Sequence, residues 1–435
     1  MSRVTQYVLP NGVEWIADRD HDASEFHVFF TARSGRDKER LREREGMHLI
    51  EHMFFRSTSL DKTVALTKAL EERRILSNGE TGYDYCYAYF YGPTLHKKKI
   101  LTTAFEGLTN SSYNVEEFEL EKKIVLQELE MRRSENRWVQ LEEKSAKELY
   151  GGSRYGTVFE DSLSTLPYLS LTQVLQLRTR LFRPENLTVI TIGTPKDVAI
   201  DPLINDTFGS LKSARPLKQY EMVLPERAPM RREYTCQDIS TCFVQHTLRC
   251  GKANTQDMAA LYLLSTILAG KDTSILYAEQ RLRRGLTYRQ YCTPHTGRPE
   301  MLMHINYTSS NDVLEENISL VQNVLEKLAT KRLSSADLRR YTMLAVDDVR
   351  RELEDGEARG GWYVQNAAVD VFVRPKEFAQ MIRSCSAEKI RSLVEEWLPG
   401  EGIFIMKPES KKLERIELAV VPPETVVASQ ETISQ

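Results

Sequence analysis

Hydrophobic and polar positions repeat with two different periods along this chain, and the two periods alternate. A repeat of two, as at Phe26, Val28 and Phe30, is typical of a half-buried strand, whereas apolar residues three and four positions apart predict helices. The strands predicted in this way are residues 5–9, 13–17, 25–32, 83–91, 187–192, 241–248, 301–307 and 402–407. The helices predicted are residues 47–55, 64–73, 95–111, 115–133, 171–181, 257–268, 313–331 and 335–353.

One segment, residues 213–232, interrupts this alternation. It contains three prolines, many charged residues and little periodicity, which together predict a linker. Strands and helices then restart in a similar order. We therefore expect one domain at residues 1–212, a linker at 213–232 and a second domain at 233–435, and the similar order indicates an ancient duplication.

Composition excludes several classes of protein. The 59 basic and 62 acidic side chains give a formal net charge of -3, which argues against a nucleic-acid surface. No stretch approaches the roughly 18 apolar residues of a membrane span. The six cysteines form no CxxC pair, which favours reduced thiols over a disulfide framework. The first residues lack the basic and apolar parts of a leader peptide, so we expect a cytoplasmic chain with no membrane or nucleic-acid partner.

The strongest chemical signal is the pentapeptide from His48 to His52, inside the apolar stretch 47–55. Histidines at i and i+4 lie on one helix face, so both can reach one metal ion, and Glu51 faces nearly the same way. This is the zinc-hydrolase motif in its inverted order, H-x-x-E-H. The alternative is a buried helix with hydrogen-bonded histidines. Three ionisable groups in apolar surroundings would each be costly to bury unpaired, and a bound cation removes that difficulty.

A zinc ion held by two histidines needs a third protein ligand and an open position. The helix predicted at 115–133 offers Glu121, Glu128 and Glu130. At about 100° per residue, Glu121 and Glu128 fall within the apolar arc of this helix, and Glu130 falls on its charged side. Glu121 and Glu128 are therefore the candidates, one as a ligand and one as its support. The alternative for either is a buried salt bridge to an arginine.

These motifs resemble the pitrilysin/insulysin family of zinc metallopeptidases, which includes the mitochondrial processing peptidase. The segment from Glu121 to Glu128 looks like the family's third-ligand segment. The resemblance implies that His48, His52 and Glu128 bind zinc, that Glu51 is the catalytic base, and that Glu121 supports the site. Residues 182–187 are similar to the element that closes the family's first domain.

Two further segments resemble parts of the family's substrate site. Residues 78–81, which are Asn78, Gly79, Glu80 and Thr81, look like its substrate-binding edge strand, although the family usually has alanine at the glycine. In the second half, residues 281–288 look like its Arg/Tyr element. The resemblance implies that Arg281 and Tyr288 help bind substrate and steady the tetrahedral intermediate. The alternative for these residues is a solvated basic helix end with a packed tyrosine.

The family resemblance also implies a fold and an activity. The implied fold is α+β, with two homologous domains that each pack helices on a mainly antiparallel sheet and together form half of a clamshell. The implied function is a zinc-dependent endopeptidase with one Zn²⁺ per chain, which hydrolyses unfolded peptides in an enclosed chamber. A homodimer, or a heterodimer with a related chain, would complete the site. The alternatives are a maturation peptidase for a ribosomally made peptide, working with a partner subunit, and a non-catalytic structural subunit.

Overall fold

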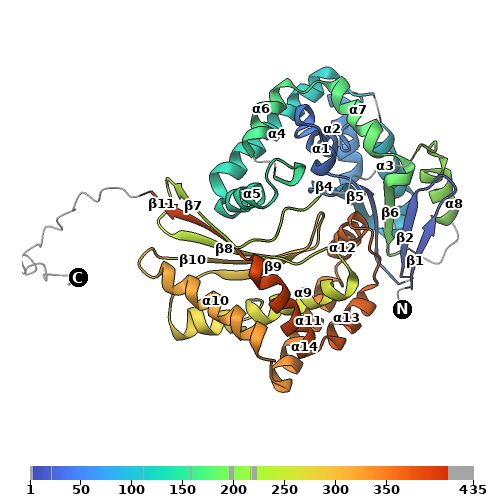
Figure 1. Ribbon diagram of the computed structural model, residues 1–435. Helices are drawn as coiled ribbons and strands as arrows, with labels where there is room; N and C mark the ends of the chain where they lie inside the picture. Colours follow the sequence, from blue (N-terminus) through green and yellow to red (C-terminus); the bar gives the residue numbers. More distant parts are fainter. Residues whose placement is uncertain are drawn as a thin grey trace, which may run out of the picture.

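The computed structural model describes residues 3–20, 22–110, 112–156, 159–194, 200–215, 217 and 223–409, which form two lobes with one sheet each (Figure 1). The sheet of the first lobe has the order β1-β2-β6-β3-β5-β4, and that of the second lobe has the order β7-β11-β8-β10-β9. The strands of the first sheet are β1 (Arg3–Val8), β2 (Glu14–Arg19), β3 (Glu25–Ala32), β4 (Leu76–Thr81), β5 (Cys86–Pro93) and β6 (Leu187–Ile192). Those of the second are β7 (Met230–Cys236), β8 (Cys242–Arg249), β9 (Gln290–His295), β10 (Leu302–Ser309) and β11 (Gly402–Pro408).

The two sheets repeat one topology from β2 onwards. Strand β2 pairs in parallel with β6, just as β7 pairs in parallel with β11, and the other pairs are antiparallel. The order β2-β6-β3-β5-β4 therefore corresponds strand for strand to β7-β11-β8-β10-β9. The α+β fold with two mainly antiparallel sheets is confirmed, and the repeated topology supports the inferred duplication.

Strand β7 corrects one detail of the predicted organisation. It begins at Met230, inside the segment 213–232 that we expected to be linker. As an edge strand, β7 is largely exposed along its length, so it lacks the apolar alternation that marks half-buried strands.

Helices surround both sheets. The first lobe contains α1 (Gly46–Met53), α2 (Leu60–Glu71), α3 (Lys97–Thr109), α4 (Val115–Glu135), α5 (Arg137–Tyr150), α6 (Phe159–Thr165), α7 (Leu171–Leu181) and α8 (Ile200–Asp206). The second contains α9 (Thr255–Leu268), α10 (Leu314–Thr330), α11 (Ser335–Glu352), α12 (Gly356–Ala368), α13 (Pro375–Ser384) and α14 (Ala387–Trp397). Asn136 separates α4 from α5, because its side chain accepts hydrogen bonds from the first backbone amides of α5. Helix α5 was not predicted from the sequence.

One helix of each lobe packs on the sheet of the other lobe (Figure 1). Leu141 and Leu149 of α5 pack against Phe404 of the second sheet. In return, Tyr363 of α12 packs against Phe29 of the first sheet. Helix α5 is the third α-helix after β5, and α12 is the third α-helix after β10, the strand that corresponds to β5. The exchange of helices therefore follows the internal repeat. The exchange holds the two lobes together.

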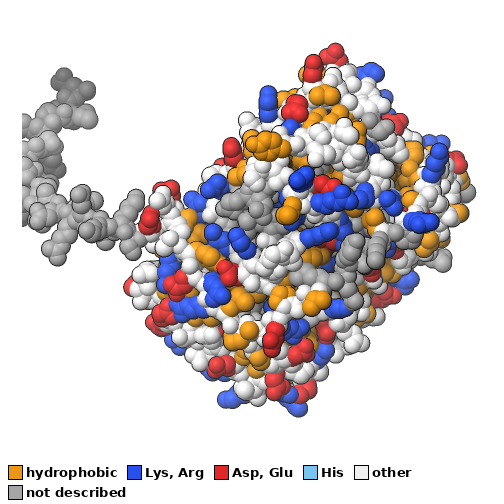
Figure 2. All heavy atoms as spheres, turned by 45° about the horizontal axis from the view of Figure 1, so that its top comes forward, with side chains coloured by type: hydrophobic (Ala, Val, Ile, Leu, Met, Phe, Trp, Pro, Cys, Tyr) orange, Lys and Arg blue, Asp and Glu red, His pale blue; other side chains and the backbone are white. Residues whose placement is uncertain are grey.

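The surface is mixed in character. Figure 2 shows basic, acidic and hydrophobic side chains interspersed over one face, with a band of lysines and arginines across its middle. Within the described ranges, every helix is too short or too polar to cross a bilayer.

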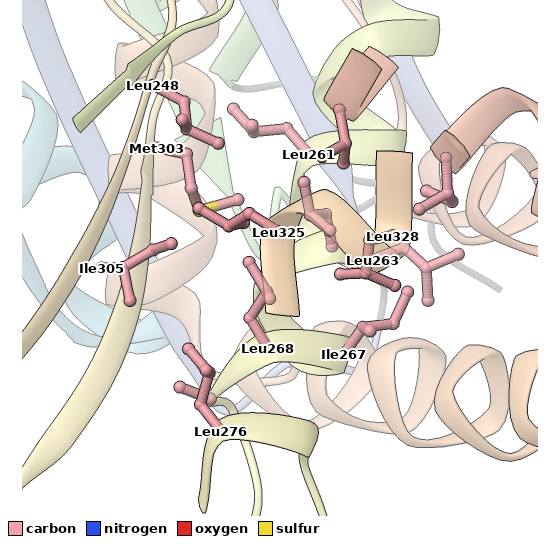
Figure 3. Close-up of a cluster of buried hydrophobic side chains, with 14 of the residues drawn as sticks. Leu248, Leu261, Leu263, Ile267, Leu268, Leu276, Met303, Ile305, Leu325 and Leu328 are labelled. Atoms are coloured by element: carbon pink, nitrogen blue, oxygen red, sulfur yellow. The ribbon is translucent and has the colours of Figure 1, made fainter. Parts of the chain in front are cut away.

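The second lobe has its own hydrophobic core, centred on α9. This helix is buried on almost every side, which explains its nearly continuous apolar sequence. Figure 3 shows its side chains meeting those of α10 and the second sheet. The labelled members of this cluster are Leu248, Leu261, Leu263, Ile267, Leu268, Leu276, Met303, Ile305, Leu325 and Leu328.

The packing of α12 on the first sheet leads to a stability prediction. A Cβ placed at Gly360 would overlap the ring of Phe29, which is fully buried and cannot move aside. We expect Gly360→Ala to lower the free energy of unfolding by about 1–3 kcal/mol. The matched control is Gly361→Ala on the same helix, where the nearest atom lies 4.0 Å away and alanine should stabilise by up to about 1 kcal/mol. Urea unfolding of both variants measures the difference. Equal stabilities would contradict this account of the packing.

Candidate metal centre and active site

The site is built on the short helix α1, which lies between α4, α7 and strands β4 and β5. Met47 and Ile50 are buried in the core of the first lobe, so the polar face of the helix turns towards α4. The start of the helix is fixed by the carboxylate of Glu39, which accepts a hydrogen bond from the backbone amide of Met47 at 2.7 Å. The core thus determines which way the histidines point.

Three predicted ligands converge beside this helix. Each of these residues offers one ligand atom, and the three atoms lie within 4.8 Å of one another; the residues are His48, His52 and Glu128. The Nε2 atoms of His48 and His52 lie 3.4 and 3.6 Å from the same Glu128 oxygen. Two imidazole nitrogens and one carboxylate form the His₂Glu donor set of catalytic zinc sites. The residues therefore fit a zinc ion.

Two further carboxylates contact the other ring nitrogens, Nδ1, of the two histidines. Nδ1 of His48 lies 3.0 Å from Glu45, and Nδ1 of His52 lies 2.9 Å from Glu121. An Nδ1–H that donates to a carboxylate leaves Nε2 unprotonated and aimed at a metal. Glu121 also forms an ion pair with Arg56, so the predicted support and the alternative salt bridge are both present.

The electrostatics of the centre also suit a cation. Burial lowers the pKa of His52, but hydrogen bonds with Glu121 and Glu128 outweigh this effect and raise it to about 9. Hydrogen bonds from His48 and His52 hold the pKa of Glu128 well below its usual value. Carboxylates therefore surround the imidazoles, and a positive charge placed between them is stabilised.

Glu45 was not recognised from the sequence. It lies three residues before His48, a spacing at which side chains of a helix meet. That spacing was the available signal. It was missed because Glu45 precedes the apolar stretch that marks the helix.

Glu51 lies next to the edge strand. It is 9% exposed and accepts a hydrogen bond from the Thr81 hydroxyl at 2.7 Å. Burial raises its pKa above the usual value, against the opposing charge of His48. A Cβ at Gly79 would lie 2.8 Å from Cγ of Glu51 and 2.9 Å from the Tyr87 carbonyl oxygen. An alanine at this position would therefore crowd both Glu51 and the backbone of β5.

Strand β4 is an edge strand that pairs with β5 and is largely exposed. Successive side chains of a strand point to opposite faces. Gly79 and Thr81 face Glu51. On the other face, Glu80 accepts hydrogen bonds from the hydroxyls of Tyr85, just before β5, and Tyr87 of β5, at 2.7 and 3.0 Å. Asn78 shares the face of Glu80. Only two of the four residues predicted to bind substrate are therefore directed at the base.

Arg281 and Tyr288 lie together in the second lobe. The Arg281 guanidinium donates to the Tyr288 carbonyl oxygen at 3.0 Å and lies 4.8 Å from the centre of its ring. The side chain of Tyr288 is 78% exposed, unlike the packed tyrosine of the alternative interpretation. The pair is thus preformed at the surface, and its role in the site stays a prediction.

Comparisons with known proteins agree with this fold. A family model described as the peptidase M16 inactive domain matches residues 168–343. An uncharacterised zinc protease of Mycobacterium tuberculosis is 22% identical over 294 residues, which cover 67% of this chain and 66% of that protein, just under two thirds of its length. A protease from Helicobacter pylori superposes with a TM-score of 0.84 at 17% identity, covering 94% of this chain and 100% of that chain. A structure from Pseudomonas fluorescens, described as a peptidase M16 inactive domain, gives 0.82 at 16% identity, covering 94% and 99%.

The fold is that of a two-lobed M16-like peptidase chain. The matches in sequence and in fold support the resemblance to the pitrilysin, or M16, family. The word "inactive" in the family model refers to residues 168–343, and the residues from His48 to Glu128 all precede that segment. The comparisons therefore support the family resemblance and do not determine the activity, which depends on the site.

Proposed function

We propose that this chain is a zinc-dependent endopeptidase that cleaves unfolded peptides. The observation that carries the proposal is the convergence of His48, His52 and Glu128 beside a buried Glu51. A non-catalytic structural subunit of the same fold would not need a complete ligand set together with an intact base. The zinc protease names of related proteins support the same conclusion.

In the proposed mechanism His48, His52 and Glu128 hold one zinc ion. When bound, zinc supplies Lewis acidity, which activates a water molecule and polarises the scissile carbonyl. Glu51 takes the proton of that water at its carboxylate and later delivers it to the leaving amine. The Thr81 hydroxyl fixes the orientation of Glu51 through their hydrogen bond.

The substrate is proposed to bind as an additional strand along the exposed β4. In this binding mode the protein mainly recognises the main chain of the substrate, so its preference for particular substrate residues should be modest. Gly79 and Thr81 lie on the face of β4 that is directed at Glu51, where the scissile bond would lie. Asn78 and Glu80 lie on the other face, where they would meet every second side chain of the peptide.

The site is proposed to be completed by a second chain. Arg281 and Tyr288 are preformed at the surface of the second lobe, so a C2 partner could place its own pair at the zinc site. Such a dimer, formed by two copies of this chain or by this chain and a related one, would be a clamshell around an enclosed chamber.

A maturation peptidase for a ribosomally made peptide, working with a partner subunit, is the second candidate function. We retain a cytoplasmic location as part of the proposal.

Mixing two inactive variants tests this assembly. Glu51→Gln lacks the base and Arg281→Ala lacks the guanidinium, so each homodimer should be inactive. Subunit exchange should form mixed dimers with one complete site, and random exchange should restore about a quarter of wild-type activity. Hydrolysis of a quenched-fluorescence peptide measures the recovery. The matched control is the exposed neighbour Arg283→Ala, which should stay active.

Two results would contradict the proposed assembly. If Arg281→Ala alone is inactive and mixing restores nothing, Arg281 acts within its own chain or supports the fold only. If Arg281→Ala keeps full activity, the resemblance of residues 281–288 to the Arg/Tyr element is misleading.

A further inference from the structure

We propose that Glu45 is a positioning residue that orients His48 towards the zinc ion; this inference rests on the proposed zinc site. Glu45 is 1% exposed, and its Oε2 lies 3.0 Å from Nδ1 of His48. Arg36 lies 3.6 Å from the same oxygen, and the Ser162 hydroxyl donates to the other oxygen at 2.6 Å. Both oxygens of the carboxylate are thus fixed, and one of them faces the imidazole.

The backbone of Glu45 points to a role for its side chain. Glu45 has φ of 67° and ψ of 5°, the left-handed region, which is costly for residues with a side chain. It directly precedes α1, where a polar side chain usually accepts hydrogen bonds from the first helical amides. Glu45 makes no such bond, because Glu39 accepts from the Met47 amide instead. The carboxylate is thereby available to His48.

The arrangement is the counterpart of Glu121 and His52. In both pairs a buried carboxylate contacts Nδ1, at 3.0 Å for His48 and 2.9 Å for His52. As a result both Nε2 atoms approach one oxygen of Glu128. Because Glu121 comes from α4 and Glu45 from the turn before α1, two separate elements fix the two rings. Loss of Glu45 should free the His48 ring and its tautomer.

The zinc dissociation constant measures this role independently of catalysis. Metal-free protein is titrated with zinc in competition with a chromophoric chelator, for wild type, Glu45→Gln and Glu45→Asn. We expect both variants to bind zinc about 10–100-fold more weakly. Asparagine tolerates the left-handed region but is too short to reach His48, so Glu45→Asn separates backbone strain from the contact. At saturating zinc both variants should regain most of the wild-type kcat, unlike Glu51→Gln.

The control variant is Glu43→Gln. Glu43 lies in the same loop but pairs with Arg180, away from His48, and its loss should leave zinc affinity unchanged. Thermal unfolding of the metal-free proteins identifies any variant that fails to fold. Ser162→Ala then serves as the milder test, because it removes one anchor of Glu45 and should also weaken zinc binding.

Two outcomes would overturn the inference in distinguishable ways. If wild type binds one zinc and the Glu45 variants bind it equally tightly, Glu45 is structural only, and the proposed peptidase stands. If wild type binds no zinc, the proposed function fails together with the role of Glu45.

Discussion

Glu51→Gln is expected to lower peptide cleavage by about 10²–10⁴-fold while the protein still binds one zinc per chain. Glutamine has the same size and can still accept the hydrogen bond from Thr81, so the site should keep its shape. It cannot take a proton from water at neutral pH. The ligands His48 and His52 are untouched. The measurements are kcat/KM on a quenched peptide and metal content by mass spectrometry.

This variant separates the base from the metal. Full zinc content with a lost reaction assigns proton transfer to Glu51. If Glu51→Gln retains more than about a tenth of wild-type activity, another group is the base, since general base catalysis contributes at least about a hundredfold. Loss of zinc together with activity would show instead that Glu51 maintains the metal site.

Glu128→Ala is expected to abolish both zinc binding and cleavage. The substitution removes the one carboxylate oxygen that both Nε2 atoms approach and leaves His48 and His52 alone. Loss of a direct ligand should weaken binding by more than the 10–100-fold typical of an outer-shell partner. Zinc should raise the melting temperature of wild type, because it binds the folded state, and should leave that of the variant unchanged. Thermal melts with and without zinc measure the difference.

The matched control is Glu130→Ala on the same helix. Glu130 is exposed on the far side of α4, whereas Glu128 is half-buried at the site. The control should keep zinc and activity. If Glu128→Ala binds zinc as tightly as the control does, the third ligand has been assigned to the wrong residue.

The sequence could predict those parts of the site that depend on local geometry. Helical periodicity places Glu121 and Glu128 on the inward arc of α4 and Glu130 outside it, and the structure has the same arrangement. The spacing of His48 and His52 likewise depends on one turn of helix. Such features need only the regular geometry of one element.

Features that depend on contacts between elements were not predictable in this way. The exchange of α5 and α12 between the lobes requires each helix to pack on a distant sheet. The split of residues 78–81 between two faces depends on the pairing of β4 with β5. Glu45 was missed because its carboxylate meets His48 across a turn in an unusual backbone conformation.

The most direct test of the central claim is the zinc dependence of cleavage by the purified wild-type chain. A quenched-fluorescence library of unfolded peptides is incubated with metal-free protein, then with protein reloaded with one equivalent of zinc, and new peptide ends are identified by mass spectrometry. We predict no cleavage without metal and full cleavage with one bound zinc. A chain that binds one zinc and leaves every peptide intact would contradict a self-sufficient endopeptidase and would favour a subunit that needs a partner or has no catalytic role.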